Sequence, residues 1–208
     1  MTQRKMLNPE NVTLTLLDYQ PAMYFGVESH NRIAVINNVM VLAKTAKLFE
    51  IPVVLSTIAK DSFSGPMMRE LSALFPDQPV HDRTSINAWL DDDYKRALEA
   101  TGRKQIVVAG LWTEACVLFP TLELLAEGYE VFVPTDACGD VSLEAHERAV
   151  DRLVQAGAVP TNALQFPFEL QQDWARAETY DGVLEILQAH SAYGIQVDFS
   201  KWALGGGA

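Results

Sequence analysis

The pattern of apolar and polar residues divides most of the chain into short apolar runs and longer stretches of helical periodicity. Runs rich in β-branched residues and leucine predict buried strands. These runs are 11–17, 51–57, 104–111 and 129–137. Helices are predicted where apolar residues recur every three or four positions. These stretches are 31–50, 66–74, 90–102, 116–127 and 142–157. Because parallel strands need long crossover connections, this alternation favours an α/β fold with a central parallel sheet and helices on both faces.

Two segments have a weaker pattern. Residues 77–89 are predicted to be a connection with a short extended piece. The C-terminal segment 168–208 can hold one or two helices, and its last part, 195–208, has the composition of a tail that includes Phe199 and Trp202. Exposed aromatic residues of this kind often pack on a neighbouring chain. We therefore expect a helix and a tail that are used in oligomer contacts.

Composition and charge narrow the class of protein. The chain has 208 residues, which fit one domain, 1–208. A hydrophobic share of 49% without an 18-residue apolar run predicts a globular protein with no membrane span. The net charge of −11 would repel phosphate backbones and anionic lipids, so we expect neither nucleic acid nor a membrane as a partner. The N-terminus lacks the apolar region of a signal peptide, and a cytoplasmic location is expected.

Three residues that could take part in chemistry are expected to meet at one edge of the sheet. Asp18 follows the first strand, Arg83 lies in the connection, and Cys116 follows the strand at 104–111. Ligands of such sheets bind outside the carboxyl ends of the strands, near the switch point. A thiol at a helix N-terminus near a cation is expected to have a lowered pKa, which would make Cys116 a nucleophile and Asp18 its acid/base partner. A cysteine buried for packing is the alternative, and these residues alone leave both interpretations open.

Four motifs carry a resemblance to a known family. They are "LLDYQPAM" at 16–23, "RTSINAW" at 83–89, "VVAGLWTEACV" at 107–117 and "FVPTDACG" at 132–139. Over roughly residues 10–167 the chain resembles the isochorismatase-like cysteine hydrolase superfamily, most closely its YcaC-like branch. The resemblance implies a three-layer Rossmann-like fold without a cofactor, and a covalent cysteine intermediate formed with small amide substrates. It also implies a homo-oligomer, with an octamer of two stacked tetramer rings as one arrangement.

The resemblance also assigns roles to individual residues. Asp18 matches the base and Cys116 the nucleophile of the family's Asp–Lys–Cys triad, while Arg83 stands where many members have lysine. An arginine stays protonated and cannot shuttle protons, so Arg83 is assigned to electrostatic support of the thiolate. The family places a cis peptide at Leu111–Trp112, and the amides of Trp112 and Cys116 would then form an oxyanion hole.

Apolar side chains near these motifs could form the wall of a substrate pocket. Tyr24 and Phe25 follow Asp18, and Ile86 and Trp89 follow Arg83. Pockets for small molecules are mostly apolar, so these four residues are predicted substrate contacts. Aromatic residues at such turns are equally often part of the core or of an interface, which is the alternative.

Other classes of site find little support in the sequence. The four histidines, His30, His81, His146 and His190, have no metal-ligand spacing, so no metal site is predicted. Neither a dinucleotide-binding glycine motif nor a P-loop occurs, and no cofactor is expected. Cys138 is interpreted as small core filler.

Three functions remain open at this stage. The leading hypothesis is cysteine-dependent hydrolysis of a small amide or related carbon–nitrogen bond. The second is vinyl ether cleavage of the isochorismatase type, in which Asp18 protonates the substrate and the cysteine is dispensable. The third is a catalytically idle oligomeric protein that keeps the fold and binds small molecules.

Overall fold

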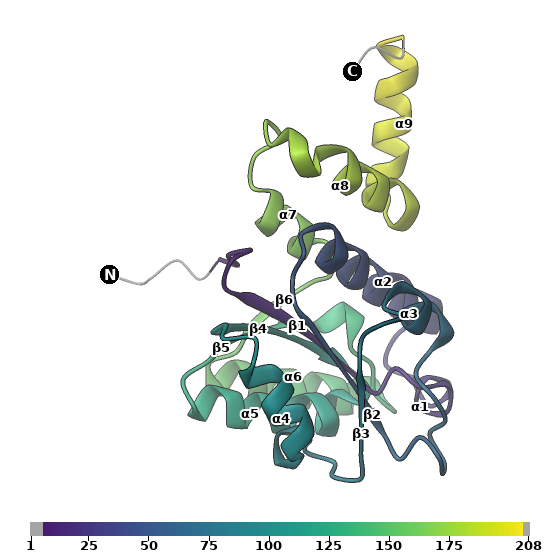
Figure 1. Cartoon of the computed structure of the whole chain (residues 1–208). Coiled ribbons are helices and arrows are strands. Elements are labelled where there is room, and N and C mark those ends of the chain that lie inside the picture. Colours follow the sequence, from purple (N-terminus) through teal and green to yellow (C-terminus); the bar gives the residue numbers. More distant parts are fainter. Residues whose placement is uncertain (1–5, 206–208) are drawn as a thin grey trace.

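The computed structural model describes residues 6–205, which form an α/β fold around a six-stranded sheet (Figure 1). All pairings are parallel, and the strand order is β3-β2-β1-β4-β5-β6. The strands are β1 (Val12–Leu17), β2 (Val53–Ile58), β3 (Val80–Arg83), β4 (Gln105–Gly110), β5 (Glu130–Pro134) and β6 (Val159–Thr161). The predicted parallel sheet is confirmed, and β6 is a strand that the apolar pattern did not predict.

The central strands are buried on both faces. Every residue of β1, β2 and β4 is buried, which explains why these segments have continuous apolar runs and not the alternation of a half-exposed strand. Polar side chains inside this core have partners. The hydroxyl of Thr13 donates to Thr101 Oγ1 at 3.0 Å, and the Thr15 and Tyr94 hydroxyls lie 2.9 Å apart. The desolvation cost of these hydroxyls is therefore offset.

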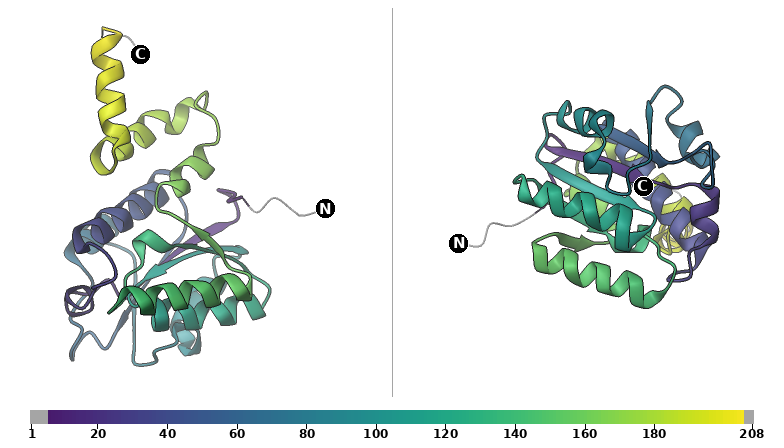
Figure 2. Two further views of the ribbon diagram at one scale, coloured as in Figure 1. Left: turned by 180° about the vertical axis from the view of Figure 1, so that it is seen from behind. Right: turned by 90° about the horizontal axis from the view of Figure 1, so that it is seen from below.

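Helices cover both faces of the sheet and form the two outer layers (Figure 2). One layer consists of α4 (Asp92–Glu99), α5 (Leu118–Ala126) and α6 (Leu143–Ala156). The other consists of α2 (Arg32–Leu48), α3 (Arg69–Leu74) and α7 (Gln165–Gln171). Shorter elements are α1 (Pro21–Phe25), η1 (Ala88–Leu90), η2 (Thr113–Val117) and η3 (Thr135–Ala137). The predicted three-layer architecture is confirmed, whereas α1 and α7 had no clear signal in the sequence.

The C-terminal segment forms two helices, α8 (Ala177–His190) and α9 (Tyr193–Ala203). α8 packs across α2, and α9 contacts α8 and projects away from the sheet (Figures 1 and 2). The segment 195–208 was expected to be a tail, but it is helical as far as Ala203, and residues 206–208 lie outside the described part of the chain. Only Gly194 is buried among the residues of α9, so this helix presents most of its surface to solvent.

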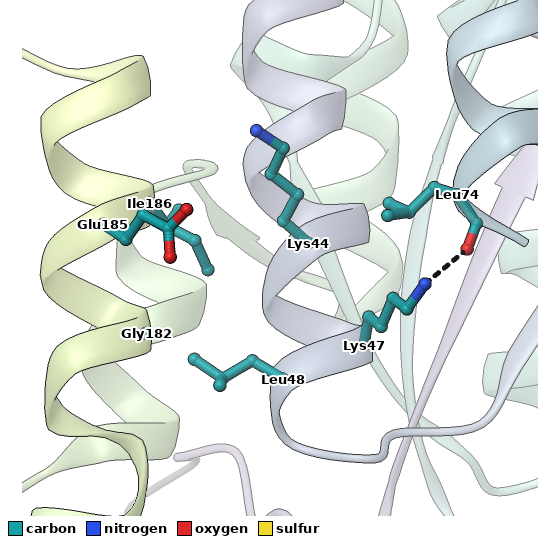
Figure 3. A pocket seen from close by; sticks show the side chains of 7 residues that line it. All are labelled: Lys44, Lys47, Leu48, Leu74, Gly182, Glu185 and Ile186. Carbon is teal, nitrogen blue, oxygen red and sulfur yellow. Dashed lines mark hydrogen bonds between the residues drawn. The ribbon is translucent and has the colours of Figure 1, made fainter.

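α8 is held on α2 by polar contacts at one end and by close packing at the other. His190 Nε2 lies 2.7 Å from Lys44 Nζ, and His190 Nδ1 lies 2.9 Å from Asn37 Oδ1. A Cβ added to Gly182 would lie 2.5 Å from Leu48 Cδ1, so the helices approach closely because this residue is glycine. A cavity of about 260 Å³ remains between α2, α3 and α8 (Figure 3).

Candidate active site

The candidate site lies where the sheet reverses its winding. β1 and β4 are neighbours, with Leu17 paired to Gly110, although a long stretch of chain separates them. A Cβ added to Gly110 would lie only 2.6 Å from the carbonyl oxygen of Leu17, so this close approach requires glycine. Asp18 leaves the end of β1, and Cys116 lies in η2 beyond the end of β4. The two predicted residues thus meet at the switch point.

Asp18 has a strained backbone that its surroundings hold in place. Its φ angle is 59°, in the left-handed region that non-glycine residues rarely adopt. Its amide donates to the carbonyl oxygen of Ser56 at 3.0 Å. Gln20, which is also buried, clamps the same turn, because its side chain accepts from the amide of Ile58 at 2.8 Å and donates to the Ile58 carbonyl oxygen at 3.1 Å.

Arg83 forms a bidentate ion pair with Asp18. Nη1 and Nη2 of Arg83 donate to Oδ1 and Oδ2 of Asp18 at 2.6 and 2.8 Å, and both side chains are fully buried. The guanidinium reaches across β2, where Nη1 also donates to the carbonyl oxygen of Thr57 at 3.0 Å. Burial by itself lowers the pKa of Arg83, but the hydrogen bonds and charge of Asp18 outweigh it and raise the pKa above the ordinary value. Arg83 is therefore a permanent cation at this site.

Cys116 is almost fully buried, and its thiol lies close enough to Asp18 for the carboxylate to affect its pKa. The backbone amide of Trp112 also lies against the sulfur. Burial raises the pKa of the Cys116 thiol, the charge and hydrogen bond of Asp18 raise it further, and Arg83 and the Trp112 amide oppose this rise only in part. The expected lowered pKa is wrong, because Arg83 is already paired with Asp18 and water is excluded. The resting group is a neutral thiol near a carboxylate.

The predicted pocket residues Tyr24 and Phe25 lie on α1, which contacts Trp112. The Leu111–Trp112 peptide is cis, at the position that the resemblance implies. The indole nitrogen of Trp112 donates to the carbonyl oxygen of Met23 at 3.3 Å, and a Cβ added to Gly26 would lie 3.1 Å from the indole. This hydrogen bond and the packing of the indole against Gly26 therefore hold α1 next to the site. α1 also carries Tyr24, which is half-buried, and Phe25, which is exposed.

The two predicted contacts that follow Arg83 differ in their placement. Ile86 is exposed, and its carbonyl oxygen accepts from Nη2 of Arg83 at 3.4 Å, which places it beside the cluster. Trp89 is buried, and its indole nitrogen donates at 2.8 Å to Glu127, beyond the C-terminal end of α5. Cys116 precedes the other end of that helix, roughly 13 Å away at 1.5 Å per residue. Trp89 is therefore packed in the core toward the end of α5 that is far from Cys116, and its role as a substrate contact stays a prediction.

Several buried polar residues around the candidate site were missed from the sequence. Gln20 and Asp140 follow β1 and β5, so their position after a strand end, as for Asp18, is a signal that could have found them. His146 lies on the buried stripe of α6 together with Ala149 and Leu153, and a polar residue on an apolar stripe is the corresponding signal.

Cys138 is fully buried and its thiol donates to the carbonyl oxygen of Pro134 at 3.5 Å, as suits core filler.

Within residues 6–205, no three side chains of His, Cys, Asp or Glu are grouped so that they could hold a metal ion. In the same part of the chain, no helix combines the length and the apolar character needed to cross a bilayer.

Together, the fold and the site define a doubly wound α/β protein with a buried cysteine, aspartate and arginine grouped at its switch point. The isochorismatase domain family matches residues 12–165, which is well over half of the sequence. The chain therefore belongs to the isochorismatase family.

Individual relatives place the chain more closely. It is 39% identical over 169 residues, or 81% of each sequence, to the probable hydrolase YcaC of Escherichia coli (strain K12). The crystal structure of the E. coli YcaC gene product, described as an octameric hydrolase of unknown specificity, matches with a TM-score of 0.93 at 34% identity and covers 98% of this chain and 100% of that one. YcaC from Pseudomonas aeruginosa with hexane-2,5-diol and covalent acrylamide matches with a TM-score of 0.92 at 34% identity, over 96% and 98% of the two chains. The YcaC-like branch that the motifs indicate is confirmed.

Proposed function

We propose that this protein is a cofactor-free cysteine hydrolase that cleaves a small amide or a related carbon–nitrogen bond through a covalent intermediate on Cys116. The observation that carries the proposal is the grouping of the buried Cys116 thiol with the Asp18 carboxylate, both oxygens of which accept hydrogen bonds from Arg83. A nucleophile beside a base that a third group orients is the general signature of nucleophilic catalysis.

The first half of the reaction forms a thioester. As the Cys116 sulfur adds to the substrate carbonyl carbon, the thiol proton passes to the Asp18 carboxylate, and the carbonyl oxygen becomes negative. The amides of Trp112 and Cys116 donate to that oxygen, which is the role of an oxyanion hole. When the oxygen re-forms its double bond, the carbon–nitrogen bond breaks, and Asp18 returns the proton to the leaving amine.

The second half releases the acid. A water molecule gives a proton to Asp18 while its oxygen adds to the thioester carbon. The tetrahedral species then collapses, the carbon–sulfur bond breaks, and the sulfur takes the proton back from Asp18. The products are a carboxylic acid and an amine. Arg83 keeps its charge throughout, since it stabilises the carboxylate and the transient thiolate without exchanging a proton.

Two observations favour this function over vinyl ether cleavage. Both oxygens of Asp18 accept hydrogen bonds from Arg83, as an ionised carboxylate does, whereas vinyl ether protonation needs a carboxylic acid. A structure of the P. aeruginosa relative contains covalent acrylamide. Acrylamide is an electrophile to which thiolates add, so a reactive thiol in this chain is a reasonable inference from that relative.

Acrylamide labelling followed by mass spectrometry tests the nucleophile. The wild type is expected to gain one adduct on Cys116, and Cys116→Ala none. Because burial and Asp18 raise the pKa of the thiol, labelling should be slow at pH 7 and accelerate as the pH rises. A parallel screen across small amides detects turnover by the release of amine or ammonia. An unlabelled Cys116, together with no hydrolysis of any amide, contradicts the proposal and favours the catalytically idle alternative.

We also infer that the chain is a homo-oligomer and that α9 contributes to its contacts. Ile195, Phe199 and Trp202 are 75%, 61% and 78% exposed on this projecting helix. Exposed apolar surface of this extent commonly marks a protein contact. The E. coli relative is described as octameric, and an octamer is the proposed assembly here.

The double variant Phe199→Glu/Trp202→Glu is expected to lower the molar mass of the assembly, because two charges would enter an apolar contact. Light scattering after size-exclusion chromatography measures the mass. Lys201→Glu, on the same helix and also exposed, changes charge without removing apolar surface and serves as the control. An unchanged mass for the double variant would exclude α9 from the interface.

A further inference from the structure

The turn that carries Cys116 is held from behind by the segment after β5. η2 is a π-helical turn, and its N-terminus has no side-chain cap of its own. The first two amides of the turn instead bond outside it: the amide of Thr113 donates to the carbonyl oxygen of Gly139 at 3.0 Å, and that of Glu114 to Oδ2 of Asp140 at 2.8 Å. Cys116 follows two residues later, so its place depends on these anchors.

Asp140 joins three segments at this point. It is fully buried, and its second carboxylate oxygen accepts from the amide of Val141 at 2.8 Å. Its backbone carbonyl accepts from the amides of Glu28 and Ser29 at 2.8 and 3.1 Å, and its own amide donates to Ser29 Oγ at 2.9 Å. Burial raises the pKa of Asp140, and the amides that it binds oppose the rise. A buried carboxylate whose oxygens both accept backbone amides is a rigid anchor.

His146 fixes the same turn from α6. Its Nδ1 lies 2.9 Å from Thr113 Oγ1, and that hydroxyl donates to the carbonyl oxygen of Gly139 at 3.1 Å. Because the hydroxyl proton is already used, His146 must donate through Nδ1–H, which defines its tautomer. Burial and the neighbouring His30 lower the pKa of His146 to about 4, so the ring is neutral at pH 7.

The residues that anchor η2 also contact one another. The His30 and His146 rings meet edge to face with centroids 4.5 Å apart, and His30 Nδ1 lies 2.8 Å from Ser29 Oγ. Ser29 Oγ in turn accepts the Asp140 amide. η2 is thus held by the turn after β5 and by α6, and both of these are linked to the loop before α2. None of these contacts involves Asp18, Arg83 or the Cys116 sulfur.

We propose that Asp140 and His146 are positioning residues, which hold η2 so that the Cys116 sulfur faces Asp18 and the Trp112 amide. The inference rests on the proposed function, since it explains how the Cys116 nucleophile is oriented. Misplacing a reacting group by about 1 Å can cost about 100-fold in rate. Neither residue touches the sulfur, so their loss should affect the chemical step and leave substrate binding nearly intact.

His146→Phe removes the donor and keeps a ring, whereas His146→Asn keeps a donor near the position of Nδ1. Asp140→Asn places an amide group against a backbone N–H. We expect His146→Phe and Asp140→Asn to lower kcat by about 10- to 100-fold with KM within about threefold, and His146→Asn to restore kcat to within about threefold of the wild type. The rate constant of Cys116 labelling by acrylamide at a fixed pH should change by about threefold or more in the first two variants and return to the wild-type value in the third.

His190→Phe is the matched control, because it removes a different histidine, which is half-buried and joins α8 to α2 away from the site. It should lower the melting temperature and leave labelling and kcat unchanged. The same result for His146→Phe and Asp140→Asn would overturn the inference, since their role would then be structural alone. If the wild type cleaves no amide, the test depends on the labelling rate alone. A changed rate in His146→Phe and Asp140→Asn supports the positioning role even though the proposed function fails, and an unchanged rate rejects it.

Discussion

Cys116→Ala is expected to lower turnover on any amide that the wild type cleaves by about 10³-fold or more, because the alanine side chain offers no nucleophile. The fold should survive. The thiol is small, and Asp18 keeps both hydrogen bonds from Arg83 when the thiol is removed. The loss of one hydrogen bond costs about 1 kcal/mol in the free energy of unfolding. The measurement is kcat/KM from amine release, with the melting temperature recorded in parallel.

The second cysteine provides the control for this substitution. Cys138 is also buried, and its thiol bonds to a backbone carbonyl outside the Asp18–Arg83 cluster. Cys138→Ala should therefore keep turnover within about threefold while losing a similar amount of stability. If Cys116→Ala kept full turnover, no thioester could lie on the pathway, and a route in which Asp18 acts without the sulfur would replace it.

The fold was predictable because burial leaves a strong signal in the sequence. β1, β2 and β4 are buried along their whole length, so their apolar runs identify a parallel sheet. β6 has three residues, none of them fully buried, and a strand of this kind has no such run. The helix predicted from residue 116 begins instead as the π-helical turn η2, because the amides of its first turn bond to residues after β5, which helical periodicity does not reveal.

The members of the site were predictable, but their electrostatics were not. Asp18 and Cys116 follow the ends of β1 and β4, and Arg83 is the last residue of β3, so parallel strands bring all three positions to one edge. The direction of the Cys116 pKa shift depends on how deeply the sulfur is buried and on which group pairs with Arg83, and both are three-dimensional facts. The contact of Trp89 with Glu127 was not predictable for a similar reason, since sequence position does not tell where an indole points.

Arg83→Met is expected to lower the free energy of unfolding by about 3–5 kcal/mol, because it leaves the Asp18 carboxylate buried without its cation. Both side chains are fully buried, so solvent cannot take over the role of Arg83. Urea denaturation at pH 7 measures the loss. The double variant Asp18→Asn/Arg83→Met removes both charges and should recover part of the stability but no turnover.

Arg83→Lys separates the charge of this residue from its shape, and it restores the residue type that many family members have. Lysine keeps a cation near Asp18 but provides one point of attachment in place of two. Its stability should therefore lie between those of the wild type and Arg83→Met, and its turnover should be closer to that of the wild type. If Arg83→Lys were as inactive as Arg83→Met, the bidentate geometry and not the charge would be what orients Asp18. If Arg83→Met itself kept full turnover, the electrostatic role of Arg83 would be wrong, and Asp18 with Cys116 would have to carry the reaction alone.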